Sequence, residues 1–360
     1  MTQRVCFIIT GLAYGGAELQ LVKLAKNFVL RGWTVSVVSL MQPKAFVEEL
    51  EALGIHVFST KLSRKSPVAL VSAAIKIRRH LIKFKPDVVH SHLVHANILS
   101  RVLRLFCRMP VLVCTCHSMT EGGQLRNIAY RITDHLADQT TYVSQAALTA
   151  ALADKRVTPS RAIVVYNGID LDHFLPASNL VDSGVFKWVS VGRLVPSKGV
   201  DVLLKAFALS PEYFHLSIVG DGEQLHNLQS LSSSLGIDHR VSFLGHLNDV
   251  APIIYNSNAF ILASHYEGYG LVVAEAMACA RPAIVTACGG PEEIVSADST
   301  CGYIVPINDP KSVSQAMIAM ATMPASDFLK MGEQSASRIA KYFDIRVVSD
   351  RWISIYKELS

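Results

Sequence analysis

The stretch Phe186-Lys-Trp-Val-Ser-Val191-Gly192-Arg193-Leu-Val-Pro-Ser-Lys198-Gly199 places a glycine-rich turn directly after an apolar run. A run of this length and composition is typical of a buried strand, and the turn leads into a helical pattern. Arg193 and Lys198 lie five residues apart in the turn, where two cations suit a diphosphate. The stretch therefore predicts a strand, a turn and a helix that together bind an anion.

A second glycine turn, Glu267-Gly-Tyr-Gly-Leu-Val-Val-Ala-Glu275, has a similar form. Gly268 and Gly270 allow the backbone to approach an anion closely, and the helix is predicted from Leu271 to Met277. The free N–H groups at a helix N-terminus, with a positive dipole end of about half an elementary charge, favour a bound phosphate. The backbone expected to contact phosphate comprises Gly268, Tyr269, Gly270, Leu271 and Val272.

Short apolar runs alternate with helical patterns along the chain, in two series. The first series is Val5–Ile9, Thr34–Leu40, Ile55–Phe58, Asp87–His90, Val111–Thr115 and Thr140–Val143. The second is Phe186–Val191, His215–Val219, Val241–Leu244, Ala259–Leu262 and Ala283–Thr286. Parallel strands require crossover helices and are buried on both faces, so we expect two helix-covered parallel sheets. Ligands of such sheets bind beyond the carboxyl ends of the strands, where Arg193 and Glu267 lie.

These motifs resemble those of the family-4 retaining glycosyltransferases of the GT-B fold. The likeness begins at Thr10-Gly-Leu-Ala-Tyr-Gly-Gly-Ala-Glu18, in which Gly15 and Gly16 match the first-turn glycines. The other matches are His117 to the active-site histidine, Arg193 and Lys198 to the diphosphate clamp, Glu267 and Glu275 to the paired glutamates, and Asn167–Asp170 to the turn before the interdomain linker.

The resemblance implies an α/β protein of the GT-B fold, with two Rossmann-like parallel-sheet domains facing across a cleft. Residues 1–172 would bind the acceptor, residues 173–342 would bind the donor, and a helix over residues 343–360 would return to the N-terminal domain. The implied reaction is retaining transfer of a hexosyl group from a nucleotide sugar, UDP- or GDP-linked, to an acceptor hydroxyl. No cofactor is implied.

The resemblance also gives the site residues separate roles. Glu275 would hold the ribose hydroxyls, Glu267 would lie near the transferred sugar, and His117 would position that sugar or stabilise charge at its anomeric carbon. Two other activities stay open, a nucleotide-sugar 2-epimerase on the same fold and a non-catalytic sugar-binding protein. Release of nucleoside diphosphate only in the presence of an acceptor would separate a transferase from both.

Length and composition are typical of a globular protein of two domains. The 360 residues are 50% hydrophobic, and no apolar run reaches the roughly 18 residues that a membrane span needs. The N-terminus enters a strand pattern without a cleavage-type signal, so we expect a cytoplasmic protein. The seven cysteines are odd in number and lie mostly in apolar strings, which indicates reduced core residues.

Three histidines, His90, His92 and His95, suggest a metal site, an interpretation that we disfavour. We expect the first two to alternate between faces if the strand continues, and no acidic residue accompanies them. The resemblance also implies a reaction without bound metal. Polar packing at a strand end, or a place beside the acceptor, is the preferred interpretation.

Positive charge is concentrated in the first half of the chain. Residues 1–172 hold 21 Lys/Arg against 11 Asp/Glu, whereas residues 173–360 hold 13 against 18. Lys76, Arg79 and Lys83 are predicted on one face of a helix after Pro67. The apolar stripe expected on its opposite face is Leu70, Ala74, Ile77, Leu81 and Phe84. On a second helix, the basic residues are Arg101, Arg104 and Arg108.

Two interpretations of these six basic residues stay open. They form either a solvated surface or a surface that docks to anionic phospholipid, at about 1 kcal/mol for each basic residue. Docking would place the protein peripherally on the inner face of the cytoplasmic membrane, with a lipid-linked glycan as acceptor in the synthesis of lipopolysaccharide, another surface polysaccharide or a glycolipid. Nucleic acid is disfavoured as a partner because no aromatic residues are interleaved with the cations.

Overall fold

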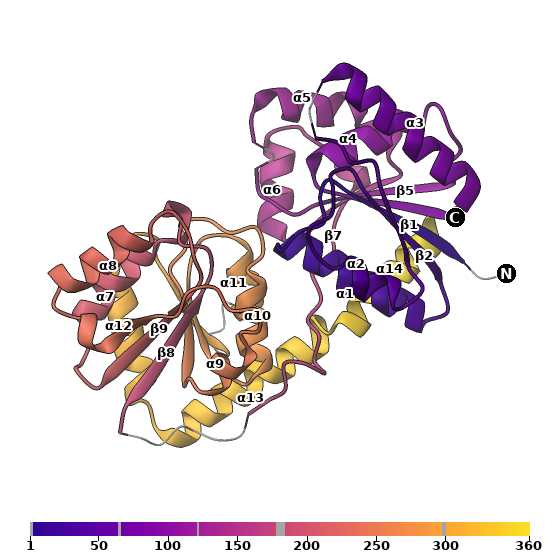
Figure 1. The fold of residues 1–360 in the computed structure, drawn as a ribbon. Helices are drawn as coiled ribbons and strands as arrows, with labels where there is room; N and C mark the ends of the chain where they lie inside the picture. Colours follow the sequence, from indigo (N-terminus) through magenta and orange to yellow (C-terminus); the bar gives the residue numbers. More distant parts are fainter. Residues whose placement is uncertain (1–2, 64–65, 121, 178–183, 297–299) are drawn as a thin grey trace. The chain divides into compact units, whose positions relative to one another are not determined.

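A computed structural model of the chain describes residues 3–63, 66–120, 122–177, 184–296 and 300–360. The chain divides into two compact units, Met1–Gly168 with Ile345–Ser360 and Ile169–Asp344. Each unit contains one parallel β-sheet covered by helices (Figure 1). Within the described ranges, none of the helices combines the length and the apolar content that a bilayer-spanning segment needs.

The sheet of the first unit has seven strands in the order β3-β2-β1-β4-β5-β6-β7. Its strands are β1 (Arg4–Ile9), β2 (Thr34–Ser39), β3 (His56–Ser59), β4 (Val88–His92), β5 (Val111–Cys116), β6 (Gln139–Tyr142) and β7 (Ala162–Val164). The chain begins in the middle of the sheet and winds outward in both directions, as in doubly wound α/β folds. The carboxyl ends of β1 and β4 are therefore adjacent, so the turns that follow them meet.

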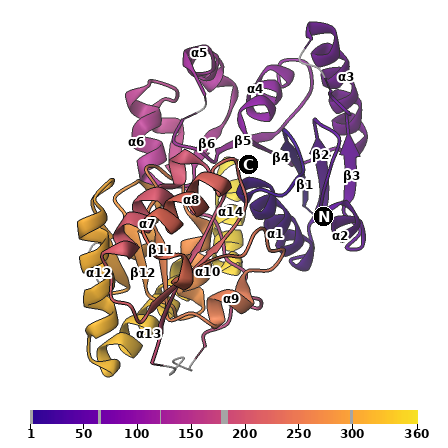
Figure 2. The same ribbon diagram turned by 60° about the vertical axis from the view of Figure 1, so that its left-hand side comes forward.

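Helices cover both faces of this first sheet. They are α1 (Gly16–Leu30), α2 (Val47–Glu51), α3 (Pro67–Phe84), α4 (Val94–Leu103), α5 (Gln124–Thr133), α6 (Gln145–Ala153) and α14 (Ile345–Leu359), with 3₁₀ turns at Asp134–Leu136 and Pro159–Arg161. Neighbouring residues of β1 serve opposite cores. Phe7 packs in the core that includes α1 and α14, and Ile8 packs in the core under α3 and α4. Figure 2 shows α1 and α14 on one side of the sheet and α3 and α4 on the other.

The last helix completes the first unit. α14 buries Val348, Trp352, Ile355 and Tyr356 in the same core as Phe28 of α1, and the two helices lie side by side (Figure 1). Arg31, which follows α1, pairs with Asp350 (2.9 Å) and donates to the carbonyl oxygen of Arg346 (2.9 Å). The unit is thus assembled from both ends of the described chain.

The second unit has a six-stranded parallel sheet in the order β10-β9-β8-β11-β12-β13. Its strands are β8 (Phe186–Val191), β9 (Phe214–Val219), β10 (Val241–Phe243), β11 (Ala259–Leu262), β12 (Ala283–Thr286) and β13 (Gly302–Val305). Its helices are α7 (Val200–Ala208), α8 (Leu225–Ser234), α9 (Ala251–Tyr255), α10 (Leu271–Ala278), α11 (Gly290–Val295), α12 (Pro310–Thr322) and α13 (Ala325–Tyr342), with 3₁₀ turns at Pro196–Lys198 and Asp238–Arg240.

Each predicted strand is present, with ends that differ by at most two residues, and three strands (β8, β11 and β12) have the predicted bounds. The prediction omits β7 and β13, the outermost strands at one edge of each sheet. Both are short and carry partly exposed side chains, so their apolar signal is weak. All seven cysteines are free thiols, as expected.

Candidate functional site

The turn after β8 presents Arg193 and Lys198 at the carboxyl edge of the second sheet. It enters α7 through Gly199, whose φ of 58° is left-handed. A Cβ on Gly199 would meet the carbonyl oxygen of Ala263 at 2.1 Å. Only glycine therefore lets this turn lie against the end of β11. Arg193 is exposed, and Lys198 is partly covered.

Glu267 lies in the turn after β11 and is held there by backbone contacts on both sides. Its N–H donates to the carbonyl oxygen of Cys288 (2.9 Å), and its own carbonyl accepts from the N–H of Gly290 (3.1 Å). Gly270, with a φ of 88°, then starts α10. These contacts fix the backbone of Glu267 between the ends of β11 and β12.

Lys198 and Glu267 form an ion pair between Nζ and a carboxylate oxygen, although they are 69 residues apart in the sequence. Their side chains are 17% and 21% exposed. The pair is thus partly desolvated while still reachable from solvent, which strengthens its electrostatic interaction compared with an exposed pair. The two predicted motifs of the second unit are therefore joined by a direct contact that spacing alone does not reveal.

Glu275 and Tyr269 are both buried. Glu275 lies in the second turn of α10, five residues after its start cap. The ring of Tyr269 lies edge-on to that of Phe343, with centroids 6.3 Å apart, so its side chain packs inward. What Tyr269 can offer a phosphate is its backbone, as for Gly268, Leu271 and Val272.

Two further glycine turns support these residues. A Cβ on Gly220 would meet the carbonyl oxygen of Gly192 at 1.9 Å, so the turn after β9 lies directly against the turn that carries Arg193. A Cβ on Gly290 would meet Cα of Tyr269 at 2.4 Å, so the turn after β12 lies against the Glu267 turn. The sequence analysis did not single out Gly289 and Gly290. The signal that could have identified them is a glycine pair shortly after the predicted strand Ala283–Thr286.

A cavity of about 580 Å³ opens beside the Lys198 turn, and sequence reasoning missed it. Its lining includes Pro196, Asp201, Gln224, His265 and Tyr266. The N–H of His265 donates to the carbonyl oxygen of Ser197 (2.9 Å), and its Nδ1 is buried with no hydrogen-bond partner among the described residues. The cavity therefore adds a histidine close to the cationic turn.

In the first unit, His117 directly follows β5 and contacts a second histidine. Its Nε2 lies 3.0 Å from Nδ1 of His92, so one ring donates a hydrogen bond to the other. Nδ1 of His117 is buried without a hydrogen-bond partner within the described part of the chain. Beside this pair, His90 contacts Oγ1 of Thr115 and the hydroxyl of Tyr356, each at 2.6 Å.

These imidazoles are neutral near pH 7. Burial lowers the pKa of His117 to about 4. Burial, together with neighbouring imidazoles, lowers the pKa of His90 and of His92 well below the usual 6.5. A neutral His117 can exchange hydrogen bonds with a hydroxyl without placing a positive charge beside it.

The expectation that His90 and His92 alternate between faces is wrong. Residues i and i+2 of a strand share one face, and the two ring centroids lie 4.1 Å apart. Across the residues that the structure describes, no group of three or more His, Cys, Asp and Glu side chains is arranged to hold a metal ion.

Gly15 and Gly16 lie at the start of α1, after β1, and are exposed. The 15-residue helix presents its free N–H groups there. Burial raises the pKa of Glu18, which occupies the first turn of the same helix. The first unit thus offers a helix N-terminus and a neutral histidine at one edge of its sheet.

Arg101 does not belong to a basic surface, so that part of the prediction is wrong. Its side chain is fully buried, donates to Oγ1 of Thr140 (2.6 Å) and to the carbonyl oxygen of Tyr130 (3.1 Å), and lies 3.9 Å from the carboxylate of Asp134. A buried guanidinium is tolerated only with such partners. Its role is to tie α4 to α5 and β6.

The second basic helix is therefore not a continuous charged face. Arg104 is partly buried and pairs with Asp138 at 2.7 Å. Arg108 is exposed but follows the end of α4 at Leu103.

The first basic helix does present its cations outward. Lys76, Arg79 and Lys83 of α3 are exposed and, with Arg4, line a cavity of about 530 Å³. The predicted core stripe is correct at Ile77 and Leu81, which are buried, whereas Leu70 is exposed. The solvent side of α3 also carries apolar residues that the prediction did not place there, namely Val68, Val71, Ile75 and Ile82.

Comparison with known proteins gives consistent results over both units. The sequence model of Glycosyltransferase Family 4 matches residues 14–173, and that of Glycosyl transferases group 1 matches residues 173–338. The chain is 25% identical to the UDP-Gal:alpha-D-GlcNAc-diphosphoundecaprenol alpha-1,3-galactosyltransferase of Escherichia coli, over 80% of each chain. It is 29% identical to the lipopolysaccharide core biosynthesis glycosyltransferase LpsE of Rhizobium meliloti, over 46% of this chain and 48% of the relative.

Among solved structures, the Anabaena protein HepE in complex with UDP and glucose superposes with a TM-score of 0.87 at 21% identity, covering 99% of this chain and 100% of that one. Two helix-covered parallel sheets with this likeness define the GT-B fold. The chain belongs to the family-4 glycosyltransferases, with a group 1 transferase region in its second half.

Proposed function

We propose that this glycosyltransferase moves a sugar from a nucleotide-sugar donor to a hydroxyl of a lipid-linked glycan, with retention of anomeric configuration. The observation that carries the proposal is the ion pair of Lys198 and Glu267, beside Arg193 and the start of α10. A cation, a carboxylate and free helix N–H groups suit a sugar diphosphate. The names of two relatives, one acting with UDP-Gal and one bound to UDP and glucose, support this donor class.

The proposed chemistry is mainly electrostatic. Arg193, Lys198 and the backbone from Gly268 to Val272 stabilise the charge that develops on the departing nucleoside diphosphate. Glu275 binds the ribose, and Glu267 lies near the transferred sugar. The acceptor oxygen attacks the anomeric carbon on the face from which the diphosphate departs, which gives retention. The bond between that carbon and the diphosphate oxygen breaks, and the hydroxyl proton passes to the departing diphosphate.

In the first unit, Gly15 and Gly16 approach the donor diphosphate or the acceptor, and His117 positions the sugar. His92 acts through His117, because the bond between their rings fixes the orientation of the His117 imidazole. The neutrality of His117 fits a group that binds a hydroxyl rather than a phosphate.

The acceptor is proposed to be lipid-linked and to be met at the inner face of the cytoplasmic membrane. Exposed cations on α3 support docking to anionic lipid, and the name of the E. coli relative specifies a diphosphoundecaprenol-linked sugar as acceptor. Lipopolysaccharide or a related surface glycan is the product class that this acceptor suggests, in line with the name of the Rhizobium relative.

Acceptor-dependent turnover tests the proposal. The protein is incubated with UDP-Gal, UDP-Glc, UDP-GlcNAc or GDP-Man, with and without a GlcNAc-diphospholipid, and nucleoside diphosphate is measured. One donor should release its nucleoside diphosphate only with the acceptor, and proton NMR of the product should show the donor's anomeric configuration. Inversion would refute retention, and equal release without acceptor would favour an epimerase or hydrolase.

A further inference from the structure

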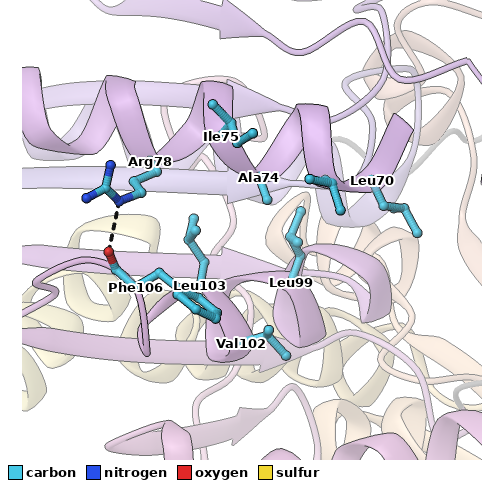
Figure 3. Close-up of a pocket in the computed structure, with 9 residues that line it drawn as sticks. Leu70, Ala74, Ile75, Arg78, Leu99, Val102, Leu103 and Phe106 are labelled. Atoms are coloured by element: carbon cyan, nitrogen blue, oxygen red, sulfur yellow. Dashed lines mark hydrogen bonds between the residues drawn. The ribbon is translucent and has the colours of Figure 1, made fainter. Parts of the chain in front are cut away.

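An apolar cavity of about 550 Å³ lies between α3 and α4 in the first unit (Figure 3). Ala74 of α3 points toward α4, and Leu99 and Leu103 of α4 point toward α3, as Figure 3 shows. The residues that line it include Leu70, Ala74 and Ile75 of α3, and Leu99, Val102 and Phe106 of α4 and the segment after it. At one end, Nε of Arg78 donates to the carbonyl oxygen of Phe106 at 2.9 Å.

A second cavity, of about 470 Å³, continues the first. The two share Leu70, Leu99 and Val102 in their linings. The second cavity reaches Thr10 and Met41, which follow β1 and β2 at the carboxyl edge of the sheet. We call the two cavities together the α3–α4 furrow. It leads from the sheet edge that carries the turns of Gly15 and His117 out along α3 to Arg78.

The furrow is open and apolar, with polar groups confined to its ends. Val71, Ile75 and Phe106 are 59%, 47% and 64% exposed. A contiguous apolar surface of this kind marks a binding site more often than a random patch does. Thr10, Ser63 and His95 lie at the sheet-edge end, and Arg78 lies at the other. This arrangement suits an elongated ligand with a polar head and a hydrocarbon tail.

The positive charge of α3 indicates that such a ligand comes from an anionic lipid surface. Lys76 and Arg79 are exposed on the same helix that forms one wall of the furrow. Lys76 and Arg79 line the cavity of about 530 Å³ on another side of α3, whereas exposed Arg78 lies at the furrow itself. A helix that carries both exposed cations and one wall of an apolar trough is complementary to an anionic lipid surface from which a chain is drawn.

We propose that the α3–α4 furrow binds the hydrocarbon chain of the lipid-linked acceptor, with the polar head toward the sheet edge. This proposal rests on the proposed function, which supplies a lipid-linked acceptor. Each methylene that the furrow buries should strengthen binding about fourfold. Affinity should therefore rise steeply with chain length until the furrow is filled.

Calorimetry of the full-length protein with farnesyl diphosphate and isopentenyl diphosphate, without vesicles, tests the proposal. Both probes carry the same diphosphate and differ only in their isoprenoid chain. Farnesyl diphosphate should bind at least about 100-fold more tightly, because its additional carbons lie in the furrow. Ala74→Trp, which fills the furrow, and Val71→Asp, which charges its exposed rim, should each remove most of that difference.

Leu125→Asp is the matched control, since Leu125 is 84% exposed on α5 and lies outside the linings of both cavities. It should bind farnesyl diphosphate like the unchanged protein. Equal affinity for the two probes, or unchanged binding in both furrow variants, would overturn the proposal. A third outcome would also overturn it. If the furrow variants lost binding to phosphatidylglycerol vesicles but still bound farnesyl diphosphate, the furrow would bind bilayer lipid rather than the acceptor's chain.

Thermal stabilisation by UDP and GDP, measured in the same preparations, keeps the two proposals distinguishable. Stabilisation by a nucleotide without a preference for the longer chain would overturn the furrow assignment alone. Failure of both nucleotides to stabilise the protein would instead count against the proposed donor site.

Discussion

Single side chains in the second unit give the sharpest test of the donor site. Arg193→Ala and Lys198→Ala should each lower kcat about 100- to 1000-fold, because each removes a charge-assisted contact to a leaving group that gains charge. Lys198→Ala should also reduce stability somewhat, since it leaves Glu267 without its ion-pair partner. Lys205→Ala is the control, because Lys205 forms an exposed ion pair with Asp201 on α7. Near-normal kcat in both clamp variants would exclude them from the site.

The two glutamates should respond differently to substitution. Glu275→Gln should weaken binding of the nucleoside diphosphate through the ribose, whereas Glu267→Gln should act chiefly on kcat. Calorimetry and steady-state kinetics separate the two effects. Glu212→Gln, at an exposed position in the same unit, is the control. Unchanged affinity in the Glu275 variant would remove the ribose role.

Buried histidines should make the first unit sensitive to acid. An unfolded histidine binds a proton near pH 6.5, whereas folded His117 does so only near about 4. Between these values the unfolded state binds more protons, so the free energy of unfolding falls as the pH is lowered. The slope is at most about 1.4 kcal/mol per pH unit for each such histidine. Urea unfolding at several pH values measures it.

His117→Gln should reduce that pH slope by the contribution of one histidine, and exposed His226→Gln should leave it unchanged. Identical slopes in the unchanged protein and the His117 variant would show that His117 is already protonated, or not buried, in the folded state.

The positions of candidate site residues could be predicted from the sequence where those residues directly follow a strand. The turns of Gly15, His117, Arg193 and Glu267 lie where the strand pattern puts them. Contacts between distant segments were not predictable. No spacing relates Lys198 to Glu267, or His92 to His117, because each pair is brought together by neighbouring strands of a sheet.

Among the secondary-structure elements, α3 has two proposed roles, which are docking to anionic lipid and binding of the acceptor's hydrocarbon chain. The first can be tested on its cations. Replacing Lys76, Arg79 and Lys83 together by Gln should weaken binding to phosphatidylglycerol vesicles by about 1 kcal/mol for each charge removed. Binding should also fade with salt, because the Debye length shrinks from about 10 Å at 0.1 M to about 3 Å at 1 M. Co-sedimentation measures both.

The control is a triple variant with the same charge change, in which exposed Lys311, Lys330 and Lys357 become Gln. Equal loss in the two triple variants would show that net charge, rather than α3, governs the interaction. Equal binding of the unchanged protein to neutral and anionic vesicles would leave the three cations as an ordinary solvated face.

Helical periodicity explains both the success on α3 and the failure on α4. The pattern correctly separates Ile77 and Leu81 from Lys76 and Lys83. It cannot distinguish an exposed arginine from Arg101, whose charge is satisfied by Asp134 and Thr140 from later segments. It also assumes a polar outer face, whereas α3 exposes Val71 and Ile75 there.

For the molecule as a whole, α14 should be essential to the first unit. Trp352→Ala should lower the free energy of unfolding by about 3–5 kcal/mol, because it removes a buried aromatic side chain and leaves a cavity. Val347→Ala on the same helix is the control and should change it by at most about 0.5 kcal/mol, since Val347 is 44% exposed. Chemical denaturation measures both. A similar effect of the two substitutions would mean that α14 is peripheral.

Because α14 belongs to the first unit but is synthesised after the second, the order of synthesis affects how the first unit folds. Ribosomes release the first unit's strands early, but one face of its sheet has only α1 and α2 to cover it until Ile345–Ser360 emerges, roughly 180 residues after Gly168. At about 5–20 residues per second, that delay is on the order of 10 to 35 s. The second unit, continuous in sequence, can fold during this interval. We therefore expect the later-made unit to mature first, and the nascent first unit to depend on chaperones until α14 has emerged.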